Sequence, residues 1–507
     1  MERTEDRARI ALILATGALV LLGVSYIVRT SFAFDDRRVF CLWDDAMISM
    51  TYARNLVEGH GLVWNPGGER VQGFSNLGVT LAMAGVHLLP LAPEHTALAF
   101  QLLCLACLVA TLLAVARVAG RDDPWQGVAA ANFTLFAAPL AVWSLQGSDA
   151  APLALWLVAC AGVLSQPSPR PAVVAALSAG ALLRPDAGLF FAAALAARAT
   201  SAPRPRAALL AGALALAASA GAYLLFGWLY YGDPLPNTWY LKATGMPRAL
   251  IWSRGLRSLG IWLPGALPAF AAWFAAVALA PRDRLLRIAT ACLAAGLVYE
   301  VSVGGDWIVK LGSRFLAPLL PLLAMCTARG LALGFARFAP RYTLLALLLG
   351  GVLCGYAASP PAAALEWLLV REPTLLAEYN RANWRLGAYL RDHGDPALRV
   401  AVHWAGVVPY VSRRYAIDVL GKSDRHIARL EVDRFEPGHA KWDWDYVLET
   451  QRPDVFDAPS RGLERDARFL RDFVRVRARD GVAFYLRRGA AGLLHDLPQQ
   501  PEPRASE

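Results

Sequence analysis

Two consecutive carboxylates, Asp44 and Asp45, come soon after the first long hydrophobic segment of the chain. Charged side chains beside a bilayer are costly unless water, a partner or chemistry accounts for them. A carboxylate at an apolar boundary can have a raised pKa, which suits it to accept a proton as a general base. Asp44 also stands where a helix would begin, so an N-cap is its alternative role. Because a cap needs only one acid, we predict a catalytic site with Asp44 as the base and Asp45 as its partner.

Further candidates for chemistry interrupt or flank other hydrophobic segments. Arg184 breaks one segment in the sequence Arg-Pro-Asp, and Arg314 begins another at a place where positive charge is unusual for an outer loop. Lys242 could meet a phosphate as a point charge. The rings of Trp239 and Tyr240 suit stacking against sugars, although both could equally be ordinary residues of the membrane interface. These residues predict a pocket that holds an anionic group.

The remaining polar candidates share a position in a predicted outer loop, where they could contact a substrate. They are Asp149, Asn237, Asp306 and His60. His60 lies between two glycines, where a structural role in the turn is the more frequent one. Asp44 or Asp45 could hold a divalent cation together with Asp149, because hard cations bind carboxylates from separate loops. No ligand spacing requires a metal, so a divalent metal stays an alternative.

The composition is that of a membrane protein with several spans. The chain has 507 residues, of which 56% are hydrophobic, and its mean hydropathy is +0.38. The net charge of +10 reflects an excess of arginine that we attribute to membrane topology, and no basic run indicates a nucleic-acid partner. Six of the seven cysteines, all except Cys41, fall in apolar segments, so we predict no disulfides.

Arginine positions constrain the membrane topology. If residues 74–90 form a re-entrant or surface helix instead of a span, every short arginine-bearing loop between spans falls on the cytoplasmic side, as the positive-inside rule prefers. This solution predicts about eleven spans, with the N-terminus inside and the C-terminus outside. Residues 10–28 are long enough to be a retained span and are followed by no clear cleavage site for a signal peptidase.

The predicted organisation has a membrane domain at residues 1–359 and a small α/β domain at 360–497. Within the second domain, strands are predicted at 398–403, 415–420 and 445–448, and a hairpin turn at 480–481. Residues 498–507 are rich in proline and charge and are predicted to be disordered. Directly after Asp45, Ile48, Tyr52 and Leu56 repeat every four residues, which predicts an amphipathic helix along the outer leaflet.

The order of these motifs resembles that of GT-C membrane glycosyltransferases that use polyprenyl-phosphate sugars, and most closely the terminal arabinofuranosyltransferase branch. The motifs are Asp44-Asp45, Tyr52-Ala53-Arg54-Asn55-Leu56, Gly59-His60-Gly61, Asn65-Pro66-Gly67, Arg184-Pro185-Asp186, Pro236-Asn237-Thr238 with Lys242, and Gly304-Gly305-Asp306 with Arg314. In the C-terminal part, Gly406, Tyr410, Ile417-Asp418, Leu420-Gly421, Gly438-His439 and Asp445-Tyr446 resemble the outer domain of that branch.

The chain departs from this pattern at two places. Relatives commonly carry Gly-Leu-Glu-Thr-Pro in the second outer turn, whereas this chain has Gly-Ser-Asp-Ala-Ala-Pro at 147–152. Lys422 stands after Leu420-Gly421, where a hydrophobic residue is usual.

The resemblance implies an enzyme of the bacterial inner membrane whose active site and C-terminal domain face outward. It would transfer a glycosyl unit, arabinofuranosyl being the closest parallel, with inversion from a polyprenyl-phosphate sugar to a glycan or lipid-linked acceptor of the cell envelope. Asp44 or Asp45 would take the proton of the acceptor, and Lys242, Arg314 and Arg184 would hold the leaving phosphate. A lipid or glycan transporter also places charges at broken helices. A cell-envelope binding protein is the third alternative.

Overall fold

Helices form most of the molecule, and the longest of them are apolar. The computed structural model describes residues 2–478 and 481–495, and within them seven helices are long and apolar enough to cross a membrane. An eighth span results if α5 (Pro124–Phe136) and α6 (Ala138–Leu145), which meet at a bend of 55°, are taken as one. The seven are α1 (Glu2–Thr30), α4 (Pro93–Ala119), α10 (Arg206–Tyr231), α12 (Arg248–Leu279), α13 (Arg284–Ser302), α14 (Leu320–Phe338) and α15 (Thr343–Ala357), the last two counted with the 3-10 turn before each.

Three further apolar helices are shorter than a bilayer requires. They are α7 (Ala150–Leu164), α8 (Pro171–Leu177), which runs into a 3-10 turn, and α9 (Ala187–Ala199). The predicted break at 184–186 is found between α8 with its turn and α9. About 20 residues are needed to cross the hydrocarbon core of a bilayer, so these helices do not qualify by length alone. The count of about eleven spans therefore stays a prediction.

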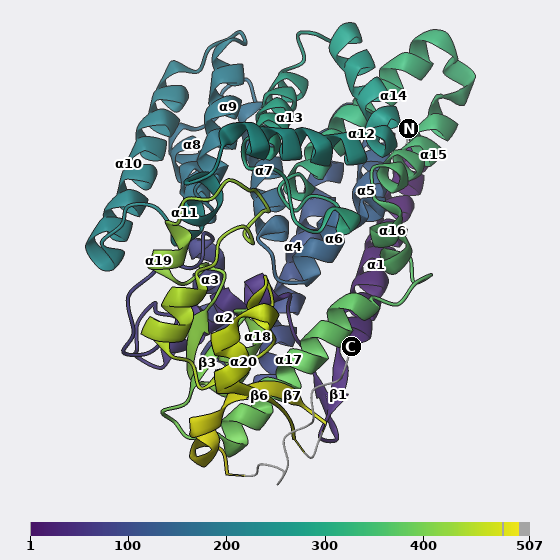
Figure 1. The fold of residues 1–507 in the computed structure, drawn as a ribbon. Helices are drawn as coiled ribbons and strands as arrows, with labels where there is room; N and C mark the ends of the chain where they lie inside the picture. The colour runs from purple at the N-terminus through teal and green to yellow at the C-terminus, as the bar shows by residue number, and fades with distance from the viewer. Residues whose placement is uncertain (1, 479–480, 496–507) are drawn as a thin grey trace.

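Arginine-bearing loops gather at the end of the bundle that lies away from the C-terminal domain (Figure 1). Arg121, Arg282, Arg284 and Arg329 line one cavity of about 300 Å³ there. Arg329 also pairs with Asp283 at 3.3 Å. This cavity brings together two of the arginine-bearing loops, the one after α4 and the one before α13, whereas Arg329 belongs to α14. The side of the membrane on which the loops lie stays a prediction.

The segment that follows α1 lies between the bundle and the C-terminal domain. A two-stranded hairpin, β1 (Phe32–Phe34) and β2 (Arg37–Val39), leads into α2 (Asp44–Val57) and then α3 (Leu77–His87). At 11 residues α3 spans only about 16 Å, which agrees with the prediction that this segment does not cross the membrane.

The helix predicted after Asp45 exists, but its predicted position along the outer leaflet is wrong. In α2 all residues from Ala46 to Asn55 are buried. The polar face is covered because the C-terminal domain packs on it: the Arg54 guanidinium donates to the carbonyl oxygen of Tyr410. Asn55 donates to the carbonyl oxygens of Val63 and Trp64, at 2.9 and 3.0 Å. Thus α2 lies between the bundle and the C-terminal domain, and its residues from Ala46 to Asn55 are buried within the protein, where they do not contact lipid headgroups.

The C-terminal part folds around a sheet of five strands in the order β4-β3-β5-β7-β6. Strand β3 is parallel to β4 and β5, while β7 is antiparallel to β5 and β6. The strands are β3 (Arg399–Val402), β4 (Tyr415–Asp418), β5 (Val455–Phe456), β6 (Phe473–Arg477) and β7 (Ala483–Arg487). The helices around them are α16 (Pro361–Trp367), α17 (Thr374–His393), α18 (Val407–Ser412), α19 (Arg425–Ala428) and α20 (Ala467–Asp472).

Two of the strands predicted for this domain are confirmed and one is wrong. The strands at 398–403 and 415–420 correspond to β3 and β4. Residues 446–451 form a single helical turn instead of a strand, because the Asp443 carboxylate accepts a hydrogen bond from the backbone N–H of Tyr446 at 2.9 Å. Gly481 of the predicted hairpin turn lies between β6 and β7, which pair antiparallel, whereas Asp480 and residues 498–507 lie outside the described residues.

The C-terminal domain shares its packing with the bundle. Trp384 on α17 and Tyr410 on α18 belong to the same hydrophobic cluster as the core of α4 and α14. The two parts meet at α2 and at the short helix α11 (Asn237–Ala243), which lies beside α19 (Figure 1). The domain boundary at residue 360 stays a prediction.

Candidate active site

Asp44 and Asp45 both lie in the first turn of α2, but Asp44 points into the protein. It is 3% exposed, and its Oδ1 accepts hydrogen bonds from the backbone N–H groups of Gly406 (3.0 Å) and Val407 (3.1 Å). Its Oδ2 is buried and has no hydrogen-bond partner among the described residues. Burial raises the pKa of Asp44 to about 6. Asp44 therefore ties the first outer loop to the start of α18 in the C-terminal domain.

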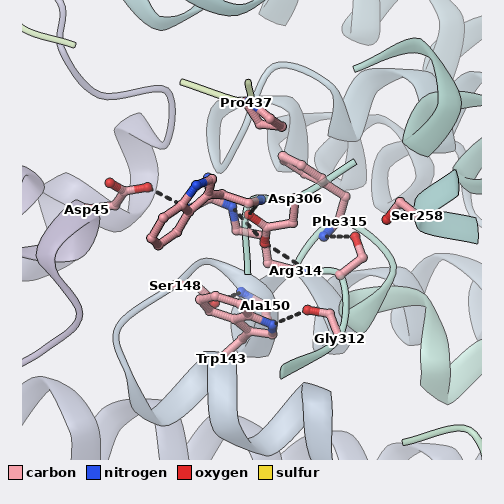
Figure 2. A network of polar contacts seen from close by, with 12 residues as sticks. Asp45, Trp143, Ser148, Ala150, Ser258, Asp306, Gly312, Arg314, Phe315 and Pro437 are labelled. Carbon is pink, nitrogen blue, oxygen red and sulfur yellow. Dashed lines mark hydrogen bonds and ion pairs between the residues drawn. The ribbon is translucent and has the colours of Figure 1, made fainter. Parts of the chain in front are cut away.

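Asp45 faces a cavity and forms two ion pairs. The Arg314 Nη1 atom lies 2.8 Å from its Oδ2, a contact drawn in Figure 2, and the Lys422 Nζ atom lies 2.7 Å from its Oδ1. Burial alone would raise the pKa of Asp45, but the positive charges of Lys422, Arg314 and Lys242 outweigh it and hold this pKa well below its usual range. Asp45 is therefore ionised, and each carboxylate oxygen has a cation beside it.

The cavity beside Asp45 has a volume of about 540 Å³, which is in the range of small-molecule sites. Apolar rings form part of its wall, among them Trp43, Trp143 and Phe315. Its charged lining residues come from the bundle, the outer loops and the C-terminal domain. The charged residues are Asp45, Asp149, Arg184, Asp186, Lys242, Asp306, Arg314 and Lys422. With cations and acids in equal number, the cavity suits a ligand that carries both hydroxyl groups and an anion.

Arg184 lies at the wall of this cavity with its charge already balanced. Its Nη1 is 3.0 Å from Asp149 Oδ1, and its guanidinium also pairs with Asp186. The guanidinium carbon lies 5.6 Å from the centroid of the Phe315 ring. The proline at 185 ends the helical turn before it, so the break in the helix directs Arg184 toward Asp149.

Asp306 fixes the position of Arg314. Its Oδ2 lies 3.4 Å from Arg314 Nε, and its Oδ1 accepts a hydrogen bond from the backbone N–H of Trp307 at 2.7 Å (Figure 2). Gly305 has φ of 73°, and an added Cβ would come within 2.6 Å of the Ser258 side chain. A residue other than glycine would thus displace the loop that carries Asp306.

Lys242 is the cation of the cavity that lacks an ion pair. Within residues 2–478 and 481–495, no acidic group lies within ion-pair distance of its ammonium. Burial and the nearby charge of Arg314 lower the pKa of Lys242 to about 8. Its positive charge is therefore destabilised in the unliganded protein, and an anion in the cavity would relieve this.

The other predicted substrate contacts divide between the cavity and the scaffold around it. Trp239, like Asp149 and Asp306, lines the cavity. The side chain of Asn237 is buried in the protein, and Tyr240 lies under the guanidinium of Arg429, 4.1 Å from ring centroid to Cζ. His60 is exposed and lines a different pocket, between the first outer loop and the C-terminal domain.

Asn237 positions a loop of the C-terminal domain. Its Nδ2 group donates to the carbonyl oxygens of Gly421 (2.9 Å), Lys422 (3.1 Å) and Asp424 (3.0 Å). The Asp418 carboxylate holds the same loop by accepting from three backbone N–H groups, at 2.6 to 3.1 Å. This loop is what presents Lys422 to Asp45.

Lys422 is the site residue for which sequence reasoning assigned no role. The signal in the sequence is that a lysine stands where a hydrophobic residue is usual in the family that the chain resembles. The structure explains why a lysine stands at position 422, since its side chain is buried (5% exposed) and pairs with Asp45. Burial would lower the pKa of Lys422, but the neighbouring Asp45 carboxylate favours its charged form and raises this pKa.

The carboxylates of the cavity are engaged by cations. In the described part of the chain, no group of three or more His, Cys, Asp and Glu side chains is arranged to hold a metal ion. Asp45 and Asp149, which could share a cation if they faced each other, pair instead with Lys422 and Arg184, respectively.

Solved structures share this architecture over nearly the whole chain. ArnT from Cupriavidus metallidurans in the apo state superposes with a TM-score of 0.59 at 15% identity, covering 96% of this chain and 99% of that one. ArnT bound to undecaprenyl phosphate gives 0.57 at 13% identity, with the same coverage. The oligosaccharyltransferase of Archaeoglobus fulgidus, tethered with an acceptor peptide, gives 0.57 at 10% identity, covering 95% of this chain and 74% of that one.

The chain thus has the GT-C fold of membrane glycosyltransferases, a helical membrane bundle with a small C-terminal sheet domain. At these low identities the likeness concerns the fold. A family model described as a domain of unknown function (DUF8728) matches residues 376–485, which form most of the C-terminal domain. Comparison with curated proteins finds no match.

Proposed function

We propose that this protein is a membrane glycosyltransferase that takes a sugar from a polyprenyl-phosphate donor and transfers it to a glycan or lipid-linked acceptor of the cell envelope. The observation that carries the proposal is the cavity in which Asp45 lies among Arg314, Lys422 and Lys242. A carboxylate base and several cations for a leaving phosphate are the groups that this reaction needs. The likeness in fold to ArnT, which was solved with undecaprenyl phosphate, supports a lipid-linked donor.

In this reaction the acceptor hydroxyl oxygen attacks the anomeric carbon of the donor sugar, and its proton passes to Asp45. The bond from the anomeric carbon to the phosphate oxygen breaks, and the polyprenyl phosphate leaves with the electron pair. Attack on the face opposite to the leaving group inverts the anomeric configuration. Asp45 is preferred to Asp44 as the base because Asp44 accepts bonds from Gly406 and Val407 away from the cavity.

The ion pairs of Asp45 suggest how the donor prepares the base. Arg314 and Lys422 neutralise Asp45 in the unliganded protein and lower its pKa, so it is a weak base in that state. A phosphate that enters the cavity would compete for the same cations. As they turn toward the phosphate, the pKa of Asp45 would rise and a carboxylate oxygen would become free to accept a proton. Lys242, which has no counter-ion among the described residues, would be the first contact of the phosphate.

The outer face of the bacterial inner membrane is the proposed site of the reaction. Arg121, Arg282, Arg284 and Arg329 gather at the far end of the bundle, and the positive-inside rule puts that end in the cytoplasm. The cavity then opens toward the outside, where lipid-linked sugars serve the assembly of envelope glycans. Arabinofuranose is the first sugar to test, because the motifs of the first outer loop resemble those of the arabinofuranosyltransferase branch.

The test is transfer by the purified protein in detergent or nanodiscs. Decaprenyl- and undecaprenyl-phosphate sugars, including the arabinofuranosyl donor, are incubated with envelope glycan fragments and lipid-linked acceptors, with and without divalent cations. We expect one donor to be consumed with release of polyprenyl phosphate by wild-type protein and not by Asp45→Asn. Movement of lipid-linked sugar across proteoliposomes without release of polyprenyl phosphate would instead identify a transporter.

A further inference from the structure

A cluster of aromatic rings extends from the cavity wall to the protein surface. Trp404, in the loop after β3, is its centre, and its ring centroid lies 6.1 Å from that of Trp43, 6.1 Å from that of Trp307 and 5.4 Å from that of Tyr379. We call these four residues the aromatic cluster. They come from the first outer loop, the loop after α13, helix α17 and the C-terminal domain. The mechanism proposed above uses none of them.

Exposure rises along the cluster from the cavity outward. Trp43 lines the cavity and is 7% exposed, Trp404 is half-buried, and Trp307 and Tyr379 are 39% and 44% exposed. Trp307 follows directly on the cavity residue Asp306. The aromatic cluster therefore reaches from exposed rings to a ring in the wall of the cavity that Asp45 lines.

Polar groups suited to sugar hydroxyls accompany these rings. The Glu436 carboxylate accepts a hydrogen bond from Trp307 Nε1 at 2.9 Å and pairs with Arg461 at 2.7 Å. The Asp457 carboxylate accepts from the backbone N–H of Trp404 at 3.3 Å and so fixes the loop. A carboxylate, a guanidinium and fixed rings together supply acceptors, donors and apolar faces, the three features that a pyranose or furanose ring presents in turn.

Membrane-belt residues are the ordinary alternative for exposed aromatic side chains in such a protein. Two observations separate the cluster from a belt. Trp404 and Tyr379 belong to the C-terminal domain, outside the bundle of spans, and Trp404 contacts rings of three other segments instead of standing alone. Aromatic residues of a membrane belt lie along the membrane–water interface and are not expected to cluster at the wall of a cavity.

We infer that the aromatic cluster is an acceptor subsite, and that the acceptor is a carbohydrate chain whose ring faces lie against Trp307, Trp404 and Tyr379. The inference rests on the proposed function and gives it an acceptor class. The chain end that reaches Trp43 would present its hydroxyl to Asp45, while the preceding sugars occupy the rings nearer to solvent. A carbohydrate chain presents an apolar ring face at each sugar and so can stack on successive rings of the aromatic cluster, whereas a lipid headgroup or an ordinary peptide does not present such repeated faces.

The test measures binding without requiring transfer. Full-length Asp45→Asn protein is titrated by isothermal calorimetry with arabinofuranosyl, mannosyl and glucosyl hexasaccharides, a hexapeptide and phosphatidylglycerol in nanodiscs. We expect one of the hexasaccharides to bind, and the added Trp404→Ala substitution to weaken this binding by about two- to tenfold, the range for the loss of one aromatic ring contact. Trp404→Phe, which keeps a ring, should retain most of the affinity.

Matched controls separate the cluster from aromatic side chains in general. Tyr379→Ala should weaken binding, whereas Tyr342→Ala, which removes a tyrosine of similar exposure (45%) between α14 and α15, should not. Absence of saccharide binding, or binding unchanged in Trp404→Ala and Tyr379→Ala, would overturn the inference. If saccharide binding depends on the aromatic cluster but the wild-type protein transfers no sugar to that saccharide or to the other acceptors, the proposed function is overturned and the cluster remains a saccharide-binding site.

Discussion

Asp44 and Asp45 are separated by one peptide bond, yet their surroundings shift their pKa values in opposite directions. Successive residues of a helix point about 100° apart, so two neighbours in the first turn of α2 reach different surroundings. Burial raises the pKa of Asp44 to about 6, although the backbone N–H groups that donate to it act in the opposite direction. Asp45 meets Arg314 and Lys422, which lower its pKa. Within one turn of α2, Asp44 thus holds the C-terminal domain in place and Asp45 faces the cavity.

The two acids should differ in mutagenesis. Asp45→Asn removes the proton acceptor but keeps the shape of the side chain, and we expect transfer to fall by about 10²–10⁴. Asp44→Asn keeps Oδ1 as the acceptor for Gly406 and Val407 and should reduce transfer less than about tenfold. Initial rates at saturating donor, with melting temperatures as the control for folding, measure both. Equal losses in the two variants would contradict the assignment of Asp45 as the base.

Lys422 should determine the acid limb of the pH profile. Its charge lowers the pKa of Asp45, so Lys422→Met should raise that pKa and shift the acid limb of kcat/KM to higher pH. Below this limb Asp45 is protonated and cannot accept the acceptor proton. Lys422→Arg keeps the charge and should leave the limb near its original place. An acid limb that does not move in Lys422→Met would show that another group titrates.

At the scale of elements, the cavity depends on short segments held by buried polar side chains. Helix α11 carries Lys242 into the cavity, and at its first residue Asn237 holds the loop that carries Lys422. The Lys441 ammonium, in the same region, donates to the carbonyl oxygens of Tyr240 and Thr244, at 3.1 and 2.8 Å. The bonds of Asn237 and of Lys441 both join the membrane part to the C-terminal domain, so hydrogen bonds to backbone groups fix the relative position of Lys242 and Lys422.

Removing the Asn237 amide should affect stability and the donor site together. Asn237→Ala leaves three carbonyl oxygens of the 421–424 loop without their donor, which costs about 1–3 kcal/mol when such groups are buried. We expect a lower melting temperature and a higher KM for the donor. Asn65→Ala, which removes bonds to Ala416 on β4, is the matched control and should lower stability without changing the donor KM. If the donor KM of Asn237→Ala equals that of the wild-type protein, Lys422 does not contact the donor.

At the scale of the whole molecule, the cavity lies where three parts of the chain meet. The bundle contributes Arg184 and Arg314, helix α2 contributes Asp45, and the C-terminal domain contributes Lys422. The C-terminal domain therefore completes the site instead of standing beside it. This explains why the domain shares a hydrophobic cluster with the bundle through Trp384 and Tyr410.

The orientation in the membrane can be measured with engineered cysteines. Ala397 and Arg204 are exposed residues, the first in the C-terminal domain and the second in the loop before α10. In intact spheroplasts a membrane-impermeant maleimide should label Ala397→Cys and leave Arg204→Cys unlabelled until the membrane is opened. Six of the seven native cysteines are buried, so the background should be low. The reverse pattern would place the cavity on the cytoplasmic side.

Much of the fold followed from local patterns in the sequence. The long helices follow from apolar segments near the length that a bilayer requires, and the break at Arg184 follows from the proline after it. Strands β3 and β4 follow from β-branched and aromatic residues bounded by turns. The turn at 446–451 was mistaken for a strand because its alternation of apolar residues resembles one, while the bond from Asp443 that initiates the turn is not visible in such a pattern.

The sequence by itself determined which charged residues stand out, because a carboxylate pair or an arginine in an apolar context is conspicuous whatever the fold. Only the tertiary structure decided that Asp45 faces the cavity, that Asp44 bonds to α18, and that Lys422 joins the site. Lys422 and Asp45 are 377 residues apart in the chain, and Arg314 and Asp45 are 269 apart. Pairing over such separations depends on how helices and domains pack, and no local spacing of residues encodes that packing.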